Sequence, residues 1–161
     1  MSRTGFIGLN GLSESIITAI FRTVPEMQVF LYPFDCDRVQ KLATAYPCWT
    51  LDDCQSVSDE SEIIILSTPL IDLDSIAKSM KLRNTHTVVS LIPDASVQQL
   101  RLFFPHADCV RMTMISHGKN IKPMMILTGN NQKLEHFLCQ AEFLFTAISE
   151  NQFNLILTLT G

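Results

Sequence analysis

A short apolar strand that runs through a glycine turn into a helix opens the chain. Residues 3–8 read Arg-Thr-Gly-Phe-Ile-Gly, and apolar residues at helical spacing begin at Leu12. This order places free backbone N–H groups and the positive end of a helix dipole beside the carboxyl end of a buried strand. Such a turn suits a pyrophosphate group, so it indicates the opening of a dinucleotide-binding βαβ unit.

The turn departs from the dinucleotide fingerprint G-x-G-x-x-G/A in two places. Read from Gly8, Asn10 stands where the second glycine is expected, and Ser13 stands where the small third residue is expected. The second glycine normally lets the backbone approach the phosphates closely, and Asn10 brings a side chain there. Two interpretations stay open. Gly11 shifts a pyrophosphate turn by one residue, or this is a plain strand-to-helix turn without a ligand.

Strands and helices alternate along the rest of the chain. This alternation predicts an α/β fold, an open doubly wound and mostly parallel sheet of the Rossmann type with helices on both faces. Apolar runs such as residues 63–66 are typical of strands buried on both faces. The expected strands are residues 3–8, 27–32, 63–66, 87–91, 108–111 and 124–128. The expected helices start at Leu12 and end before Pro25, and span 37–46, 70–80, 96–103 and 131–149.

Helical spacing also predicts core positions and one cap. Residues 49–57 have no clear pattern. Asp35 is a plausible N-cap for the helix over 37–46. The core candidates on the later helices are Ile71, Ile76 and Met80, followed by a stripe of Leu134, Leu138, Ala141, Phe145 and Ile148.

Composition indicates one domain of 161 residues with a generous core, because 47% of the residues are apolar. The net charge is −4 and no stripe of Lys and Arg stands out, so we expect neither nucleic acid nor an anionic membrane as a partner. No apolar run approaches the ~20 residues that cross a bilayer. Five cysteines without a C-x-x-C and four scattered histidines predict free thiols in a reducing cytoplasm and no metal site.

Ligands of such sheets bind at the carboxyl ends of the strands, which directs attention to four loops. These are residues 8–13, 32–35, 67–70 and 91–96. Two readings of Ser67, Thr68 and Pro69 carry equal weight. They border a cofactor, or Thr68 caps a helix that begins at Pro69.

Other polar residues have structural readings that we favour. Ser90 at a strand end more often satisfies the backbone than faces a cleft. Asp53 is more suited to capping a short helix than to binding a ribose, and Ser96 reads as a cap. His117 is a candidate general acid, although an exposed loop histidine is far commoner.

Segments spread over the whole chain share their order and spacing with one enzyme family. The segments are Gly5-Phe6-Ile7-Gly8, residues 63–69, residues 88–92 with 96–100, Cys109-Val110-Arg111, Gly118, residues 124–129 and residues 153–161. Together they resemble the N-terminal NAD(P)-binding domain of the pyrroline-5-carboxylate reductases, two-domain enzymes that make proline. The resemblance implies hydride transfer from NAD(P)H to a cyclic imine, with NADP slightly favoured over NAD. The cofactor-binding residues it implies are Gly8, Leu9, Asn10, Gly11, Leu12, Phe34, Ser67, Thr68 and Pro69.

The departures from the family matter as much as the match. The second glycine and the asparagine of the family's Gly-x-Gly-Asn-Met turn are exchanged here, and Thr68 replaces the lysine of its Val-Lys-Pro. Tyr32-Pro33-Phe34 follows the second strand, so the choice between NADH and NADPH is not readable. Residues 113–115 replace the family's Met-Pro-Asn segment.

The chain stops where the family's helical second domain begins. We therefore expect residues 1–161 to form a single dinucleotide-binding domain, monomeric or weakly dimeric, that meets an imine substrate only with a second domain and is inactive alone. The alternative is a degenerate Rossmann domain that acts as a nucleotide-sensing or protein-interaction module.

Overall fold

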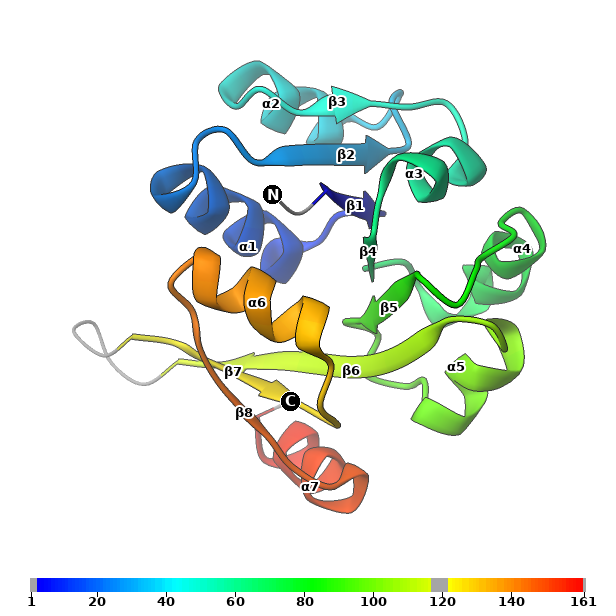
Figure 1. Cartoon of the computed structure of the whole chain (residues 1–161), viewed down its shortest axis with the longest axis vertical. Helices are drawn as coiled ribbons and strands as arrows, with labels where there is room; N and C mark the ends of the chain where they lie inside the picture. The colour runs from blue at the N-terminus through cyan, green and yellow to red at the C-terminus, as the bar shows by residue number, and fades with distance from the viewer. Residues whose placement is uncertain (1–2, 117–121, 161) are drawn as a thin grey trace.

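The computed structural model describes residues 3–116 and 122–160. Strands β1–β8 span, in order, Arg3–Ile7, Gln28–Tyr32, Trp49–Thr50, Ile63–Leu66, Thr87–Ser90, Asp108–Ile115, Met124–Leu127 and Leu144–Ala147. Helices α1–α7 span Gly11–Thr23, Asp37–Ala45, Cys54–Glu60, Leu73–Lys78, Val97–Phe103, Gln132–Gln140 and Glu150–Thr160, and a 3-10 helix, η1, spans Leu70–Asp72 (Figure 1).

The strands form one twisted sheet in the order β3-β2-β1-β4-β5-β6-β7-β8. Neighbouring strands are parallel except for β6 and β7, which are antiparallel. The parallel crossovers carry helices onto both faces of the sheet, as a βαβ connection requires. The predicted fold class, a Rossmann-like and mostly parallel α/β sheet, is confirmed.

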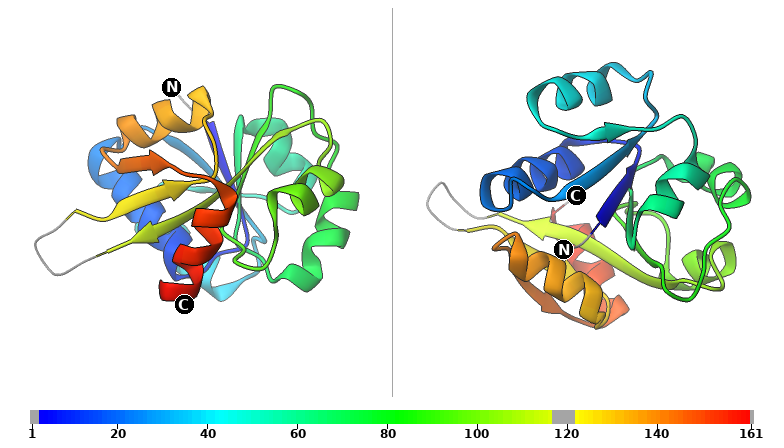
Figure 2. Two further views of the ribbon diagram at one scale, coloured as in Figure 1. Left: turned by 90° about the horizontal axis from the view of Figure 1, so that it is seen from below. Right: turned by 45° about the horizontal axis from the view of Figure 1, so that its top comes forward.

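Two apolar cores lie on opposite faces of the sheet, and β4 contributes to both. Ile63 and Ile65 pack with α1, α2 and α6, whereas Ile64 and Leu66 pack with α3, α4 and α5. All four side chains are fully buried, and each contributes about 1.5–3 kcal/mol by leaving water. In Figure 2, left, α1 and α6 lie to one side of the strands, and α4 and α5 lie to the other.

Helix α3 lies very close to β1, and Gly5 makes this approach possible. A Cβ atom at Gly5 would overlap the side chains of Val57 and Ser61. The Gly5 of the opening segment is therefore needed for packing between strand and helix, and not for a ligand.

The predicted helix over residues 131–149 is wrong beyond its first half. Helix α6 ends at Gln140, Glu142 has a φ of 60°, and the chain continues as β8, which pairs with β7. Leu134, Leu138 and Ala141 are buried as predicted, but Phe145 lies on a strand. The helical stripe over this region is a coincidence of spacing, because hydrogen bonding to β7 decides the conformation.

Four smaller expectations also need correction. The N-cap of α2 is Cys36 and not Asp35, and no side chain caps that helix. The expected helix over 70–80 is η1 followed by the short α4, and Ile71 is 88% exposed instead of in the core. Residues 49–57 hold β3 and the start of α3, and β6 extends four residues beyond the predicted strand.

Candidate functional site

The turn between β1 and α1 is held against the end of β4 by Gly8. Its φ is +78°, and its N–H donates a hydrogen bond to the carbonyl of Tyr32 at 2.9 Å. A Cβ atom here would lie 2.8 Å from Cγ2 of Thr68 and 3.2 Å from the backbone carbon of Ser67. Both the left-handed conformation and the space therefore require glycine at this position.

The two departures from the glycine fingerprint form a single capping box. The Ser13 N–H donates to Oδ1 of Asn10 at 2.9 Å, and the Asn10 N–H donates to Oγ of Ser13 at 2.8 Å. Through this reciprocal pair the N–H of Ser13, one of the free N–H groups at the start of α1, already has an acceptor. The N–H groups of Gly11 and Leu12 precede the first intrahelical donor and keep no acceptor within the described residues. A Cβ atom at Gly11 would meet nothing within 4 Å, so this end of the helix is open.

Two buried hydroxyl groups lie at the end of β4, next to Gly8. Oγ of Ser67 and Oγ1 of Thr68 are shielded from solvent and have no hydrogen-bond partner among the described residues. A buried hydroxyl without a partner costs about 1–3 kcal/mol. Both lie at the carboxyl edge of a parallel sheet, where the ligands of such sheets bind, so these two hydroxyl groups are candidate partners for a ligand.

The interpretation of Thr68 as a helix cap is wrong. The N-cap of η1 is Pro69, and no side chain makes a capping hydrogen bond there. The hydroxyl of Thr68 makes no hydrogen bond in the described part of the chain. This favours the other interpretation, in which Thr68 borders a ligand.

The segment after β2 carries both a carboxylate and a guanidinium, the two kinds of side chain that bind the adenosine ribose or its 2′-phosphate. Asp35 is exposed, and Arg38 pairs with Glu14 of α1 at 3.3 Å. A carboxylate favours a free 2′-hydroxyl and a guanidinium favours a 2′-phosphate, so this end does not choose between NAD and NADP. Phe34 is 46% exposed beside them, and its carbonyl accepts a hydrogen bond from the side chain of Gln40. Burial raises the pKa of Tyr32, and the nearby Cys54 and Asp35 raise it further.

Three polar residues have the structural roles that we favoured. Oγ of Ser90 accepts from the N–H of Ile92 at 3.1 Å. Asp53 caps α3, and its hydrogen bonds with Ser56 lower the pKa of the Asp53 carboxyl. Ser96 caps α5 in a capping box with Gln99. His117 and Gly118 lie outside the described residues.

A groove of about 300 Å³ opens where β5 and β6 end. It is lined by the end of β6, by the loop that follows β5 and by α7. The lining residues are Leu91, Ile92, Pro93, Met112, Thr113, Met114, Phe153 and Leu157. Sequence reasoning missed this groove because nothing in the sequence of residues 150–160 says where that segment packs.

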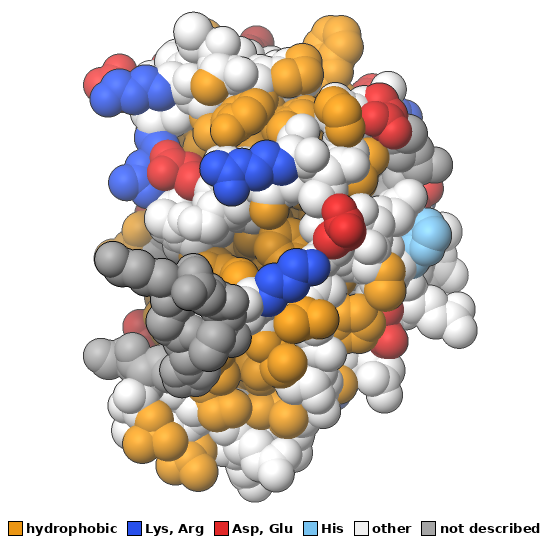
Figure 3. Space-filling model, turned by 90° about the vertical axis from the view of Figure 1, so that its left-hand side faces the viewer, with side chains coloured by type: hydrophobic (Ala, Val, Ile, Leu, Met, Phe, Trp, Pro, Cys, Tyr) orange, Lys and Arg blue, Asp and Glu red, His pale blue; other side chains and the backbone are white. Residues whose placement is uncertain are grey.

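A second groove runs along α1. It is lined by Gly11, Glu14, Ser15, Thr18, Ala19, Arg22, Met114, Pro123 and Phe143. Figure 3, which looks onto the left-hand side of Figure 1, shows hydrophobic side chains in a recess, with Lys or Arg and Asp or Glu side chains around it. Gly11 at one end connects this groove to the open start of α1.

Arg111 of β6 joins the two walls of the groove at the ends of β5 and β6, although it is only 2% exposed. One of its nitrogens, Nη1, donates to Oε2 of Glu150 at 3.2 Å and to Oδ1 of Asn154 at 2.7 Å. The other, Nη2, donates to the carbonyl of Pro93 at 2.8 Å. Its Cζ lies 4.7 Å from the centre of the Phe153 ring, a cation–π distance.

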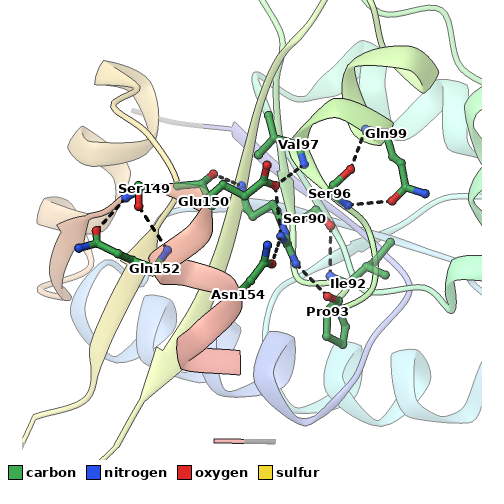
Figure 4. Close-up of polar contacts among 12 residues, drawn as sticks. Ser90, Ile92, Pro93, Ser96, Val97, Gln99, Ser149, Glu150, Gln152 and Asn154 are labelled. Carbon is green, nitrogen blue, oxygen red and sulfur yellow. Dashed lines mark hydrogen bonds and ion pairs between the residues drawn. The ribbon is translucent and has the colours of Figure 1, made fainter. Parts of the chain in front are cut away.

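Glu150 has a second role at the same place. Its Oε2 also accepts from the N–H of Val97, the first residue of α5, at 2.7 Å. Figure 4 shows the side chains of Glu150 and Asn154 pointing from α7 toward the segment that carries Pro93, Ser96 and Val97. The only sequence signal for this cluster is one arginine within an otherwise apolar strand end.

Within residues 3–116 and 122–160, no group of three His, Cys, Asp or Glu side chains is arranged to hold a metal ion. No helix among these residues is long and apolar enough to cross a membrane. The fold and the carboxyl edge together define a Rossmann-like α/β domain with a candidate dinucleotide site.

Solved structures share this fold over almost the whole chain. The pyrroline-5-carboxylate reductase of Coxiella burnetii superposes with a TM-score of 0.81 at 15% identity over 99% of this chain. The corresponding enzyme of Streptococcus pyogenes gives 0.76 at 18% identity over 98%. A reductive aminase of Aspergillus terreus, in complex with NADPH and ethyl levulinate, gives 0.77 at 8% identity over 99%.

The chain spans about three fifths of the length of these structures: 64%, 62% and 61%, respectively. No family model matches the sequence, and no curated protein matches it either. The similarity therefore lies in the fold, and it agrees with the resemblance found in the sequence.

Proposed function

We propose that this chain is the NAD(P)H-binding domain of an oxidoreductase that reduces a cyclic imine. The observation that carries the proposal is the carboxyl edge of the sheet. There the Gly8 turn, the open start of α1 and the unpaired hydroxyls of Ser67 and Thr68 converge. Each of these features fits a dinucleotide, and the two unpaired hydroxyl groups have no hydrogen-bond partner within the described residues.

The proposed contacts follow the order of the strands along that edge. The pyrophosphate is held by residues 8–12, with the N–H groups of Gly11 and Leu12 as donors at the positive end of α1. The adenosine lies toward Phe34, and Ser67, Thr68 and Pro69 border the other half of the cofactor. A bound NAD(P)H supplies a hydride that adds to the carbon of a protonated C=N bond, while the π electrons move to the nitrogen.

The comparisons support the cofactor class and the kind of reaction. The reductive aminase structure contains NADPH, and the pyrroline carboxylate reductase of Plasmodium falciparum, with a TM-score of 0.74 at 11% identity, has NADP bound. NADP is therefore slightly favoured over NAD for this chain. Pyrroline-5-carboxylate, and with it proline biosynthesis in the cytoplasm, is the specific form of the proposal.

A second function is favoured by one observation. The Asn10 side chain occupies a hydrogen-bonding position at the start of α1 that a phosphate uses in the glycine fingerprint. If the Asn10 cap takes the place of a bound phosphate, the domain does not catalyse a reaction. Its function is then that of a protein-interaction module.

Titration of the chain with NADPH and with NADH, followed by nucleotide fluorescence, separates the two functions. Saturable binding supports the cofactor domain, and no binding at millimolar concentration leaves the interaction module. The variant Gly11→Asp places a carboxylate in open space at the pyrophosphate position, where the helix dipole favours it in the folded protein. We expect it to fold normally and to bind NADPH at least about tenfold more weakly, a change worth roughly 1.4 kcal/mol.

Gly129→Asp is the matched control. Gly129 also has open space around its Cβ position, and it follows β7, which is antiparallel to β6, so it lies at the opposite edge of the sheet. Gly129→Asp adds the same charge as Gly11→Asp, and we expect the affinity for NADPH to stay unchanged. Equal weakening by both variants would show that net charge, and not the position of Gly11, determines the affinity.

A further inference from the structure

Strand β8 forms one margin of the sheet. It pairs with β7 on one side, and no strand lies on its other side within the described residues (Figure 1). The opposite margin is β3, which has only 2 residues and so offers little backbone for pairing. An edge strand carries a row of unpaired N–H and C=O groups, and natural proteins usually protect it with a charge, a proline or a covering segment.

Strand β8 has none of these protections over residues 143–149. This stretch reads Phe-Leu-Phe-Thr-Ala-Ile-Ser and contains no charged residue, no proline and no glycine. The side chains of Leu144, Thr146 and Ala147 are exposed, so no described segment covers them. An uncharged run of apolar and β-branched residues is typical of segments that pair with a strand of another chain.

The hydrogen bonds to β7 decide which backbone groups of β8 point outward. The N–H of Ile148 donates to the carbonyl of Leu127 at 2.8 Å, and Leu127 is in register with Ala147. In a parallel ladder, residues that bind the neighbouring strand alternate with residues that point away from it. Thr146 and Ile148 therefore bind β7, whereas the N–H and C=O groups of Phe145 and Ala147 point away from the sheet.

These outward groups fit a second copy of the same strand. When two copies of β8 run antiparallel about a two-fold axis at Thr146, Phe145 of each copy lies opposite Ala147 of the other. Each of these two pairs then exchanges both of its N–H···O=C hydrogen bonds. Such an interface is self-complementary, because the same patch serves both copies.

Neighbouring registers satisfy fewer backbone groups. The N–H of Phe143 already donates to the carbonyl of Leu138, and the N–H of Ser149 donates to Oε1 of Gln152. A shifted register sets Phe143 or Ser149 opposite β8 of the other copy, and a carbonyl of that strand then lacks its donor. The register about Thr146 is therefore the favoured one.

The side chains agree with this register. It sets Leu144, which is 46% exposed, opposite the half-buried Ile148 of the other copy, and this pair removes apolar surface from water. Thr146 lies opposite its own equivalent, and facing threonines are a favourable cross-strand pair. On the other face of the sheet, the large Phe145 lies opposite the small Ala147.

We propose that β8 is a self-association surface, through which two copies of this chain pair antiparallel by Phe145 and Ala147 and continue the sheet across a two-fold axis at Thr146. The pairing is short and the interface small, so the dimer is in reversible equilibrium with the monomer. The proposal does not rest on the proposed function, since β8 is not part of the candidate cofactor site.

Sedimentation velocity of the full chain from micromolar to millimolar concentration measures this equilibrium. We expect a monomer at low concentration and a dimer that increases with concentration. A monomer at every concentration overturns the proposal and leaves the edge to an extended segment of a different protein. Growth into larger species contradicts the two-fold pairing, because such pairing closes at two copies.

Variants at Thr146 test the register. The side chain of Thr146 is exposed, and the backbone bonds of this residue to β7 do not depend on it. Thr146→Glu and Thr146→Lys each place two like charges opposite each other at the axis, and we expect either variant to weaken dimerisation at least about fivefold. Thr146→Gln, which has the shape of glutamate without its charge, is the matched control and should still dimerise.

An equimolar mixture of Thr146→Glu and Thr146→Lys gives the sharpest measurement. We expect mixed dimers to form more readily than the dimers of either variant alone, because opposite charges then meet at the axis. Mixed association that is no stronger than that of the separate variants shows that Thr146 does not face its equivalent, and it overturns the proposed pairing.

Ala147→Pro tests the backbone hydrogen bonds. The N–H of Ala147 points away from β7, so proline removes a donor from the interface without removing a bond from the sheet. We expect the dimer to be lost while circular dichroism shows a folded domain, and Ala147→Ser, which keeps the N–H, should dimerise like the wild type. A dimer that persists in folded Ala147→Pro uses another surface and contradicts the proposal. If the proline variant does not fold, the charge variants at Thr146 decide the question.

Discussion

Asn10 and Ser13 cap each other at the start of α1, each donating its backbone N–H to the side-chain oxygen of the other. The same two residues are those that break the glycine fingerprint. The departures from the sequence pattern are therefore coupled, because a side chain at one position is satisfied by the side chain at the other. The helix start is stabilised, and one donor is taken away from a phosphate.

Replacing Asn10 with glycine should strengthen dinucleotide binding. The variant restores the glycine of the fingerprint and frees the N–H of Ser13, while the loss of the cap costs only a few tenths of a kcal/mol. We expect a severalfold lower Kd for NADPH in a fluorescence titration. Asn131→Gly, which removes the corresponding cap from α6, is the control and should leave the Kd unchanged. A higher Kd for Asn10→Gly would show that the amide side chain itself contacts the ligand.

Thr68→Val should change the stability of the domain and its affinity for NADPH in opposite directions. Valine removes a buried hydroxyl that has no partner among the described residues, so we expect the free energy of unfolding without ligand to rise by about 1 kcal/mol in urea denaturation. The affinity for NADPH should fall at the same time. Thr4 of β1 also has a buried unpaired hydroxyl, but it lies at the opposite end of that strand from Gly8. Thr4→Val should therefore give the gain in stability alone, and a similar loss of NADPH affinity there would remove Thr68 from the site.

Arg111 and Glu150 should be energetically coupled. Arg111→Met leaves Glu150 and Asn154 without their common donor, and Glu150→Gln removes the ionic partner while it keeps an acceptor for Val97. We expect the single variants to destabilise the domain, and the double-mutant cycle in urea to give a coupling of about 1–2 kcal/mol. Glu150 is partly exposed, so the value lies below that of a fully buried pair. Additive effects would mean that α7 is held by Phe153 packing alone.

The stability of the domain should fall at alkaline pH because of the buried thiol of Cys109 and the partly buried thiol of Cys48. Burial raises the pKa of Cys109 to about 11 and that of Cys48 to about 12, from an ordinary value of 9.0. The folded state then holds more protons than the unfolded state above pH 9, and stability is lost as the pH rises from 9 through 11 and 12. Urea denaturation between pH 7.5 and 11 tests this, with Cys109→Ala as the variant expected to flatten the profile. A wild-type profile that is level over this range would contradict the expectation.

The parts of the fold that can be predicted from the sequence are those whose conformation is set by residues close together in the chain. Residues 63–66 form a strand buried on both faces, as expected for three consecutive β-branched isoleucines followed by leucine, an apolar run that is typical of a central parallel strand. Gly8 and the start of α1 are equally local, since the turn conformation and the cap are set within a few residues. The alternation of such segments determines the parallel sheet.

The segments for which the prediction was wrong take their conformation from contacts with residues far away in the sequence. Residues 141–149 carry a helical stripe, yet Leu144–Ala147 is a strand because β7 offers unpaired backbone groups at its edge. Ile71 fits a helical core position, yet η1 places it in solvent. Local periodicity describes what a segment prefers alone, and pairing with a distant strand outweighs that preference.

The sequence by itself therefore determined the class of fold, the position of the glycine turn and the strand ends around it. Only the tertiary structure decided that the hydroxyls of Ser67 and Thr68 lack partners, and that Arg111 meets Glu150 across 39 residues of chain. The physical reason is the range of the interactions. Helices, turns and strand burial follow from neighbours in sequence, whereas hydrogen-bond satisfaction and the walls of a groove depend on segments that become neighbours only after folding.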